Sequence, residues 1–161
     1  MEGGEYLARH VSLHSILQSW SQILEHYSPL PQPECAETYL ARAKKLKQAL
    51  NTHGWNGKWY LGATKDDGTP IGNPSQKECQ IYLNSQTWAI LSGVADNQRR
   101  QEIASAMLQH LEGDNGMMLF QPGFSRPDDR IGYITRYAPS LRENGGVYTH
   151  AATWAIPAFA K

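Results

Sequence analysis

The chain has 161 residues, enough for one hydrophobic core and too few for two domains of ordinary size. Lysine and arginine together number 15, and aspartate and glutamate also number 15, so no net charge attracts nucleic acid or an anionic membrane surface. The sequence has neither a run of about 18 apolar residues nor an amino-terminal signal pattern, and we therefore expect a cytoplasmic protein that binds small neutral partners, without contact to nucleic acid or a membrane.

Two long helices are predicted in the first third of the chain. Apolar residues recur at steps of three and four, which predicts a helix over about 6–27. Three prolines between positions 29 and 33 end this helix, and a second helix begins near Glu34 with lysines on its outer side. The two helices should form an antiparallel hairpin.

Turns and shorter helices follow in the middle of the chain. Residues 55–60 place an Asn-Gly pair between aromatic residues, which predicts a small hairpin or tight loop. A third helix is expected over 84–92 with Gly93 as its stop, and a fourth runs from an Asp96 cap to about Leu111. These two helices should form a second hairpin.

The last third begins with a long connection over 112–146, rich in glycine, proline and charge, which is typical of a binding loop. A last helix begins near Tyr148, and Pro157 and the end of the chain cut it short after about three turns. Two hairpins and one unpaired helix make an all-α fold of one domain, 1–161, in which apolar faces lack partners. The chain should therefore form a homo-oligomer or be a piece of a larger barrel.

No metal or cofactor is expected from the cysteines and histidines. Cys35 and Cys79 belong to no Cys-x-x-Cys pair, and we expect two free, buried thiols. His10 and His14 lie one helical turn apart, but no third ligand stands at a recognisable spacing.

Three segments of unusual composition follow one another along the chain and read WNGKWYLGATKDDGTPIG (55–72), ECQIYLNSQTWAILSG (78–93) and LRENGGVYTHAATW (141–154). In this order they resemble glycoside hydrolase family 94, which includes cellobiose and chitobiose phosphorylases and the C-terminal phosphorylase domain of cyclic β-1,2-glucan synthases. The resemblance implies that the chain is the C-terminal part of an (α/α)6 barrel. It also implies inverting phosphorolysis of a β-glucoside or oligosaccharide by inorganic phosphate, giving an α-sugar 1-phosphate.

The third segment carries the residue expected to bind phosphate. His150 matches the family histidine that contacts this anion, and the amino end of the predicted last helix would add backbone N–H groups. Glu143 matches a family glutamate that accepts hydrogen bonds from substrate hydroxyls. The neighbouring glycines, 145–146, would let the backbone pass close to a ligand.

The second segment carries three candidate sugar-binding residues, Asn84, Gln86 and Trp88. Side-chain amides pair with sugar hydroxyls and an indole stacks on a sugar ring. Asn84 and Trp88 share one face of a helix, whereas Gln86 points elsewhere, so at least one of the three should serve the core or a cap.

A general acid is missing from this pattern. In the family it is an aspartate of a Gly-Asp-Trp-Asn-Asp-Gly segment, and neither that segment nor the family's Thr-Gly phosphate contact occurs in the sequence. Asp66, Asp67, Asp128 and Asp129 lie in turns where aspartate commonly caps the backbone. We therefore assign no catalytic residue and expect no ordinary phosphorolysis from this chain alone.

Two other functions remain open. A non-catalytic sugar-binding or oligomeric interaction module would keep the aromatic residues and cover its apolar faces by association. A small self-sufficient glycosidase would need Glu143 and a loop aspartate within about 10 Å of each other.

Overall fold

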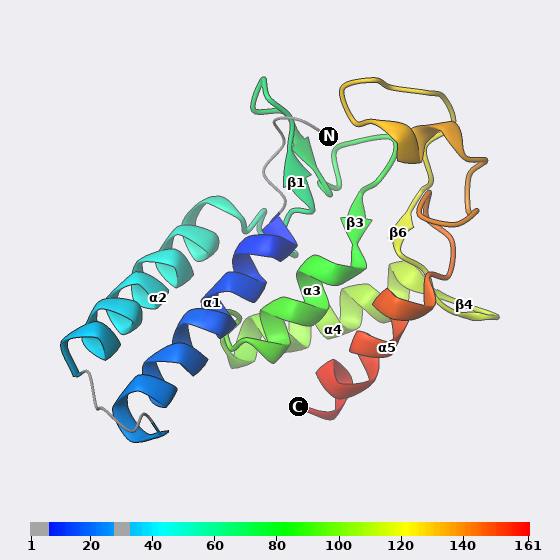
Figure 1. The fold of residues 1–161 in the computed structure, drawn as a ribbon. Helices are drawn as coiled ribbons and strands as arrows, with labels where there is room; N and C mark the ends of the chain where they lie inside the picture. Colours follow the sequence, from blue (N-terminus) through cyan, green and yellow to red (C-terminus); the bar gives the residue numbers. More distant parts are fainter. Residues whose placement is uncertain (1–6, 28–32) are drawn as a thin grey trace.

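The computed structural model describes residues 7–27 and 33–161 (Figure 1). The expected helix start at Tyr6, the prolines at positions 29 and 31 and the side chain of His10 lie outside what it describes.

Helices make up about half of the described structure. They are α1 (Leu7–Gln22), α2 (Pro33–His53), α3 (Leu83–Leu91), α4 (Asn97–Leu111) and α5 (Thr149–Ala160), together with a π-helical turn η1 (Ile23–Tyr27) and a 3-10 turn η2 (Tyr133–Arg136). Figure 1 shows α1, α3 and α5 side by side and running in the same direction, while α2 and α4 return in the opposite direction. The predicted helices and both hairpins are confirmed.

Local signals account for the helix ends in the second half of the chain. The Asp96 carboxylate accepts a hydrogen bond from the backbone N–H of Arg99 at 2.8 Å and caps α4 as predicted. Gly93 stands just after α3 with φ of 73°, a conformation that glycine adopts without strain. Pro157 lies within α5 and does not end it, because the missing N–H affects only the last turn of a short helix.

Short antiparallel ribbons in the loops were not predicted. The described residues contain β1 (Ala63–Thr64) paired with β2 (Pro70–Ile71), β3 (Ile81–Tyr82) with β6 (Phe120–Gln121), and β4 (Glu112–Gly113) with β5 (Gly116–Met117). The all-α prediction therefore holds for the packed helices and is incomplete for the loops, where two of the two-residue ribbons are local hairpins and β3–β6 joins distant segments. Most of these ribbons lie at the end where α1, α3 and α5 begin (Figure 1).

The core surrounds α3, which contacts α1 on one side and α5 on the other. Tyr60 and Phe120 are fully buried beside the aliphatic residues of α3 and α4. Trp59 is also buried, and its indole N–H donates to the carbonyls of Gly72 and Gln80, each at 2.9 Å. An aromatic residue of the first segment therefore belongs to the core and fixes the adjoining loop.

Helix α1 keeps an apolar face without a partner in the described structure. Its inner side contacts α2, where the buried His14 ring is hydrogen bonded through Nδ1 to the Ala43 carbonyl at 2.9 Å. The outer stripe is exposed by 42 to 52 %; it consists of Leu13, Ile16 and Trp20 and continues to Ile23 at the start of η1. The prediction of an unpartnered apolar face is confirmed for this helix.

Of the two free thiols, one is buried as predicted and the other is exposed. Cys79 is buried, and burial raises the pKa of its thiol well above the usual range, whereas Cys35 is exposed on α2. The prediction of two buried thiols is therefore wrong for Cys35, which lies on the outer side of the second helix.

Among the described helices, none combines the length and apolar character needed to cross a membrane.

Candidate functional site

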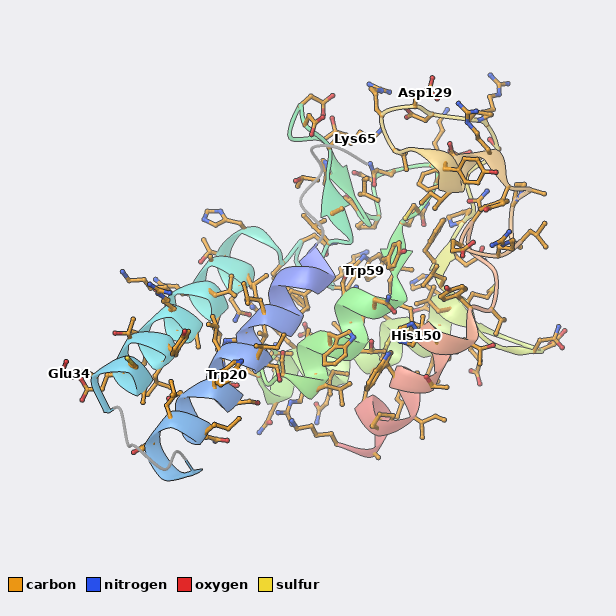
Figure 2. The ribbon with its side chains drawn as sticks, in the orientation of Figure 1. Trp20, Glu34, Trp59, Lys65, Asp129 and His150 are labelled. Carbon is orange, nitrogen blue, oxygen red and sulfur yellow. The ribbon has the colours of Figure 1, made fainter. Side chains whose placement is uncertain are left out.

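The amino end of α5 presents His150 to solvent (Figure 2). His150 stands in the first turn, and no side chain caps this helix end at Tyr148. The first N–H groups of a helix have no partner within the helix and carry a partial positive charge. His150 and this helix end therefore combine the two features that bind an anion such as phosphate.

Aromatic rings connect His150 to α3. Trp154 lies one turn further along α5, and its ring centroid is 6.2 Å from the imidazole of His150. The Trp154 ring is also 4.8 Å from that of Trp88, and both indoles are only partly buried. The structure thus brings together two of the predicted site residues, His150 and Trp88, through a tryptophan to which the sequence analysis assigned no role.

Asn84 begins the helix face that carries Trp88. It lies in the first turn of α3 and is half-buried. Its Oδ1 atom is buried and receives no hydrogen bond from any described residue. Because a buried acceptor without a donor costs about 1–3 kcal/mol, a bound molecule that donates a hydrogen bond there would recover free energy.

Gln86 lies on the opposite side of α3 and is fully buried. Its Oε1 accepts from the Tyr60 N–H at 2.9 Å, and its Nε2 donates to the carbonyls of Tyr60 and Tyr82 at 2.7 and 3.0 Å. The structure does not bring Gln86 together with Asn84 and Trp88, and its amide groups already bind the backbone. Its position anchors residues 59–61 against α3.

Glu143 lies in the loop before α5, with a side chain 29 % exposed. Its Oε2 atom is 3.4 Å from Nε of Arg142 but makes no hydrogen bond of good geometry within the described structure. The Arg142 guanidinium also stacks 4.7 Å above the ring of Tyr137. Glu143 is therefore a half-buried carboxylate with one oxygen that can still accept from a hydroxyl group.

The glycines after Glu143 allow close contact between protein segments. A Cβ at Gly145, whose φ is 82°, would lie 2.7 Å from the Phe120 carbonyl oxygen, and a Cβ at Gly146 would lie 2.9 Å from that of Arg142. The expected close approach of a ligand is replaced here by a close approach of the protein's own backbone. These glycines thus shape the loop that carries Glu143.

Asn144 is a central loop residue that the sequence analysis missed. It is fully buried, and its amide donates to the carbonyls of Phe124 and Tyr137 while its Oδ1 accepts from the Phe124 N–H at 2.8 Å. An asparagine followed by two glycines in a long loop is the local signal that points to such a residue. It connects the stretch before α5 to the loop after β6.

The loop aspartates are poor candidates for a general acid. Lys65 and Arg130 hold the pKa of Asp128 at about 2, with the Lys65 Nζ at 3.0 Å from its Oδ2. Hydrogen bonds from Thr69 lower the pKa of Asp67, which caps its own turn. A carboxyl group that has lost its proton well below neutral pH is poorly suited to donate one.

Within the described residues, no three His, Cys, Asp or Glu side chains gather to hold a metal ion.

Comparison with known proteins identifies the family. The model of the glycosyl hydrolase 94 superfamily, catalytic domain, matches residues 2–161. A solabiose phosphorylase of Paenibacillus borealis is 37% identical over 123 residues, which are 76% of this chain and 16% of the relative. An N,N'-diacetylchitobiose phosphorylase of Vibrio proteolyticus is 33% identical over 148 residues, 89% of this chain and 18% of the relative.

A third relative is named for a different activity. The cyclic beta-(1,2)-glucan synthase NdvB of Rhizobium meliloti is 41% identical over 117 residues, which are 71% of this chain and 4% of that protein. The chain thus spans less than a fifth of the length of each of these relatives. Because the family model matches almost every residue, the chain belongs to the glycosyl hydrolase 94 superfamily and carries sequence of its catalytic domain.

Proposed function

We propose that this chain forms the phosphate-binding and sugar-binding part of an inverting β-glucoside phosphorylase, with His150 for phosphate and Asn84, Trp88 and Glu143 for the sugar. Two relatives named above are phosphorylases, and the family match covers the segments that hold these residues. Gln86 is proposed to act on the sugar only indirectly, because its amide is bound to the backbone of Tyr60 and Tyr82.

The observation that carries this proposal is a pair of unsatisfied oxygen atoms. Asn84 Oδ1 has no hydrogen-bond partner among the described residues, and Glu143 Oε2 has only an ion-pair contact at 3.4 Å to Nε of Arg142; both oxygens are buried. Nearly all buried polar atoms in folded proteins have a partner, and exceptions mark strain or a missing ligand. Sugar hydroxyl groups donate hydrogen bonds and would satisfy both oxygens.

The chemistry of phosphorolysis matches the groups in this region. Phosphate is itself the nucleophile, so the protein needs no carboxylate to activate water. It must instead hold an anion against the anomeric carbon, which His150 and the uncapped amino end of α5 are suited to do. The partly buried face of Trp88 offers a stacking surface for the sugar ring.

We propose that these 161 residues bind substrate but do not complete phosphorolysis by themselves. The sequence contains no Gly-Asp-Trp-Asn-Asp-Gly segment, and Asp128, whose pKa is held at about 2, is a poor proton donor at neutral pH. Without a general acid the leaving oxygen departs unprotonated, which slows cleavage of a glycosidic bond.

The arrangement of the helices supports a partial (α/α)6 barrel. The helices α1, α3 and α5 lie side by side and run in one direction, while α2 and α4, which alternate with them in sequence, return in the opposite direction (Figure 1). The exposed stripe of α1, which includes Ile16 and Trp20, would then contact further helices of the domain. A second copy of the chain is the alternative partner, and it would fit a non-catalytic interaction module.

Calorimetric titration with glucose and short β-glucans, with and without phosphate, tests the proposed function. We expect sugar binding that tightens when phosphate is present and that weakens about tenfold or more in Glu143→Ala and His150→Ala. Matched controls are Glu102→Ala on α4 and His53→Ala on α2, both exposed and outside the site. Equal binding in wild type and both site variants, or no binding by folded protein, would contradict the proposal.

Product analysis with and without phosphate separates phosphorolysis from hydrolysis. A pure binding module gives the product of neither reaction.

A further inference from the structure

A cavity lies among the loops, away from the site at α5. It has a volume of about 250 Å³, is partly open to solvent and is lined by the β1–β2 hairpin, the stretch before β3 and the loop after β6. Figure 2 shows Lys65, one of its lining residues, on the β1–β2 hairpin, well separated from His150 at the start of α5. At about 30 Å³ per water molecule, the cavity holds roughly eight waters or one small polar molecule.

Hydrogen bonds between distant segments fix the walls of this cavity. Lys65 Nζ lies 3.0 Å from Asp128 Oδ2, and the Lys65 side chain is only 10 % exposed. Glu78 Oε1 accepts from both the N–H and the hydroxyl of Ser125. The N–H of Cys79 donates to the Pro122 carbonyl at 2.8 Å. The cavity is thus formed before any ligand arrives, which lowers the entropy cost of binding.

The charges that line the cavity are balanced. Lys65 and Lys77 are positive, whereas Glu78 and Asp128 are negative, so the cavity favours neither an anion nor a cation. The two lysines still have hydrogen-bond donors that no described residue accepts. The Lys65 ammonium has three donors and binds Asp128 with one of them, and Lys77 makes no hydrogen bond or ion pair within the described residues.

The rest of the lining is apolar. Ile71, Phe124 and Ile131 contribute carbon surface beside the charged groups. A pyranose ring has the matching character, since its C–H faces pack on apolar side chains while its hydroxyls both donate and accept. A phosphate group would meet the carboxylates of Glu78 and Asp128, and a purely apolar molecule would displace water from charged groups without replacing its hydrogen bonds.

We propose that this cavity binds one neutral pyranose unit, such as a residue of a glucan chain, at a site separate from the one that contains His150. The site would hold part of a carbohydrate chain at a distance from His150 rather than take part in bond cleavage. The inference does not depend on phosphate binding at α5.

Amide chemical shifts of the ¹⁵N-labelled protein, titrated with millimolar methyl β-D-glucoside, test the proposal. We expect saturable shifts at Lys65, Lys77, Glu78 and Ile131. Lys77→Ala removes an exposed ammonium that has no described partner, and Glu78→Gln removes a charge while keeping an acceptor for Ser125. Each should weaken binding about tenfold, whereas Lys58→Ala, an exposed lysine outside the cavity, should leave it unchanged.

The same titration on His150→Ala separates the two sites. Shifts at the cavity that persist in this variant support the proposal even when the α5 site fails to bind. The proposal is overturned when wild-type protein shows no shifts at these four residues, when shifts appear only around Trp88 and Trp154, or when Lys77→Ala and Glu78→Gln both bind as wild type does.

Discussion

Large apolar side chains occur both in the α1–α2 hairpin and in the region around α3 and α5, but those on α1 are largely exposed, whereas most of those around α3 are buried. On α1, large apolar side chains at helical spacing remain 42 to 52 % exposed. Around α3, comparable side chains are buried, and polar ones such as Gln86 and Asn144 each bind backbone groups of distant segments. Apolar spacing thus identifies the face of a helix, whereas buried polar side chains determine which segments are neighbours.

The largest effect should come from removing a buried amide near α3. Gln86→Ala leaves the backbone groups of Tyr60 and Tyr82 without their partners and creates a cavity, so the free energy of unfolding should fall by roughly 3–5 kcal/mol. Urea denaturation measures the loss. Gln109→Ala, an exposed position on α4, should change it by less than about 0.5 kcal/mol. A loss below about 1 kcal/mol for Gln86→Ala would refute this account of the loop region.

A second test concerns the tight loop that carries Glu143. Gly145→Ala combines a positive φ with a Cβ 2.7 Å from the Phe120 carbonyl oxygen, and should destabilise the protein by about 3 kcal/mol. Gly57→Ala is the matched control, because its φ is also positive but nothing lies within 4 Å of the added Cβ. It should cost about 1–2 kcal/mol. Thermal unfolding of both variants separates backbone strain from the clash, and equal losses would show that the clash contributes nothing.

The pH dependence of stability tests the buried contact between α1 and α2. Burial lowers the pKa of His14 below its ordinary value of 6.5, with Lys47 adding to the effect. The folded state then binds a proton at His14 more weakly than the unfolded chain does. The contribution of His14 to the free energy of unfolding is therefore fully present above pH 6.5 and is lost as the pH drops through the pKa of the folded state. Denaturation at several pH values should show this slope, and His14→Phe, which cannot titrate, should flatten it. An unchanged slope in that variant would assign the effect to other groups.

The smallest effect on stability should come from the exposed stripe of α1. Ile16→Ser combined with Trp20→Ser removes apolar surface that no described residue covers, so unfolding should change by less than about 1 kcal/mol. Association should change much more. Sedimentation velocity should show a smaller species than wild type if the stripe mediates contact between copies. Leu108→Ser, at an exposed position of α4, serves as the control.

Much of the helical framework could be predicted because its signals are local. The Asp96 cap, the Gly93 stop and the turn at Gly57 each depend on residues within one helical turn or one loop. The ribbons could not be predicted, since each strand has only two residues and β3 pairs with β6 across about forty residues, although β1–β2 and β4–β5 are local hairpins. Pairing of that kind depends on tertiary packing, which a single sequence does not display.

The candidate site was predictable in part. His150 and Trp88 were identified from the resemblance, but their link through Trp154 required the packing of α5 on α3. Spacing along the helix correctly separated Gln86 from Asn84 and Trp88. The role of Asn144 could not be predicted because its partners, Phe124 and Tyr137, lie up to 20 residues away in a loop without periodicity.

The ion pair between Lys65 and Asp128 has a consequence for the order of folding. It joins residues 63 positions apart, whereas α1 and α2 meet through a short connection. Closing a long loop costs entropy before any contact can offset it, so local hairpins form sooner than distant pairings. The helical hairpins should therefore assemble first, and the loops that carry Glu143 and the proposed cavity should acquire their shape in the final, slowest step of folding.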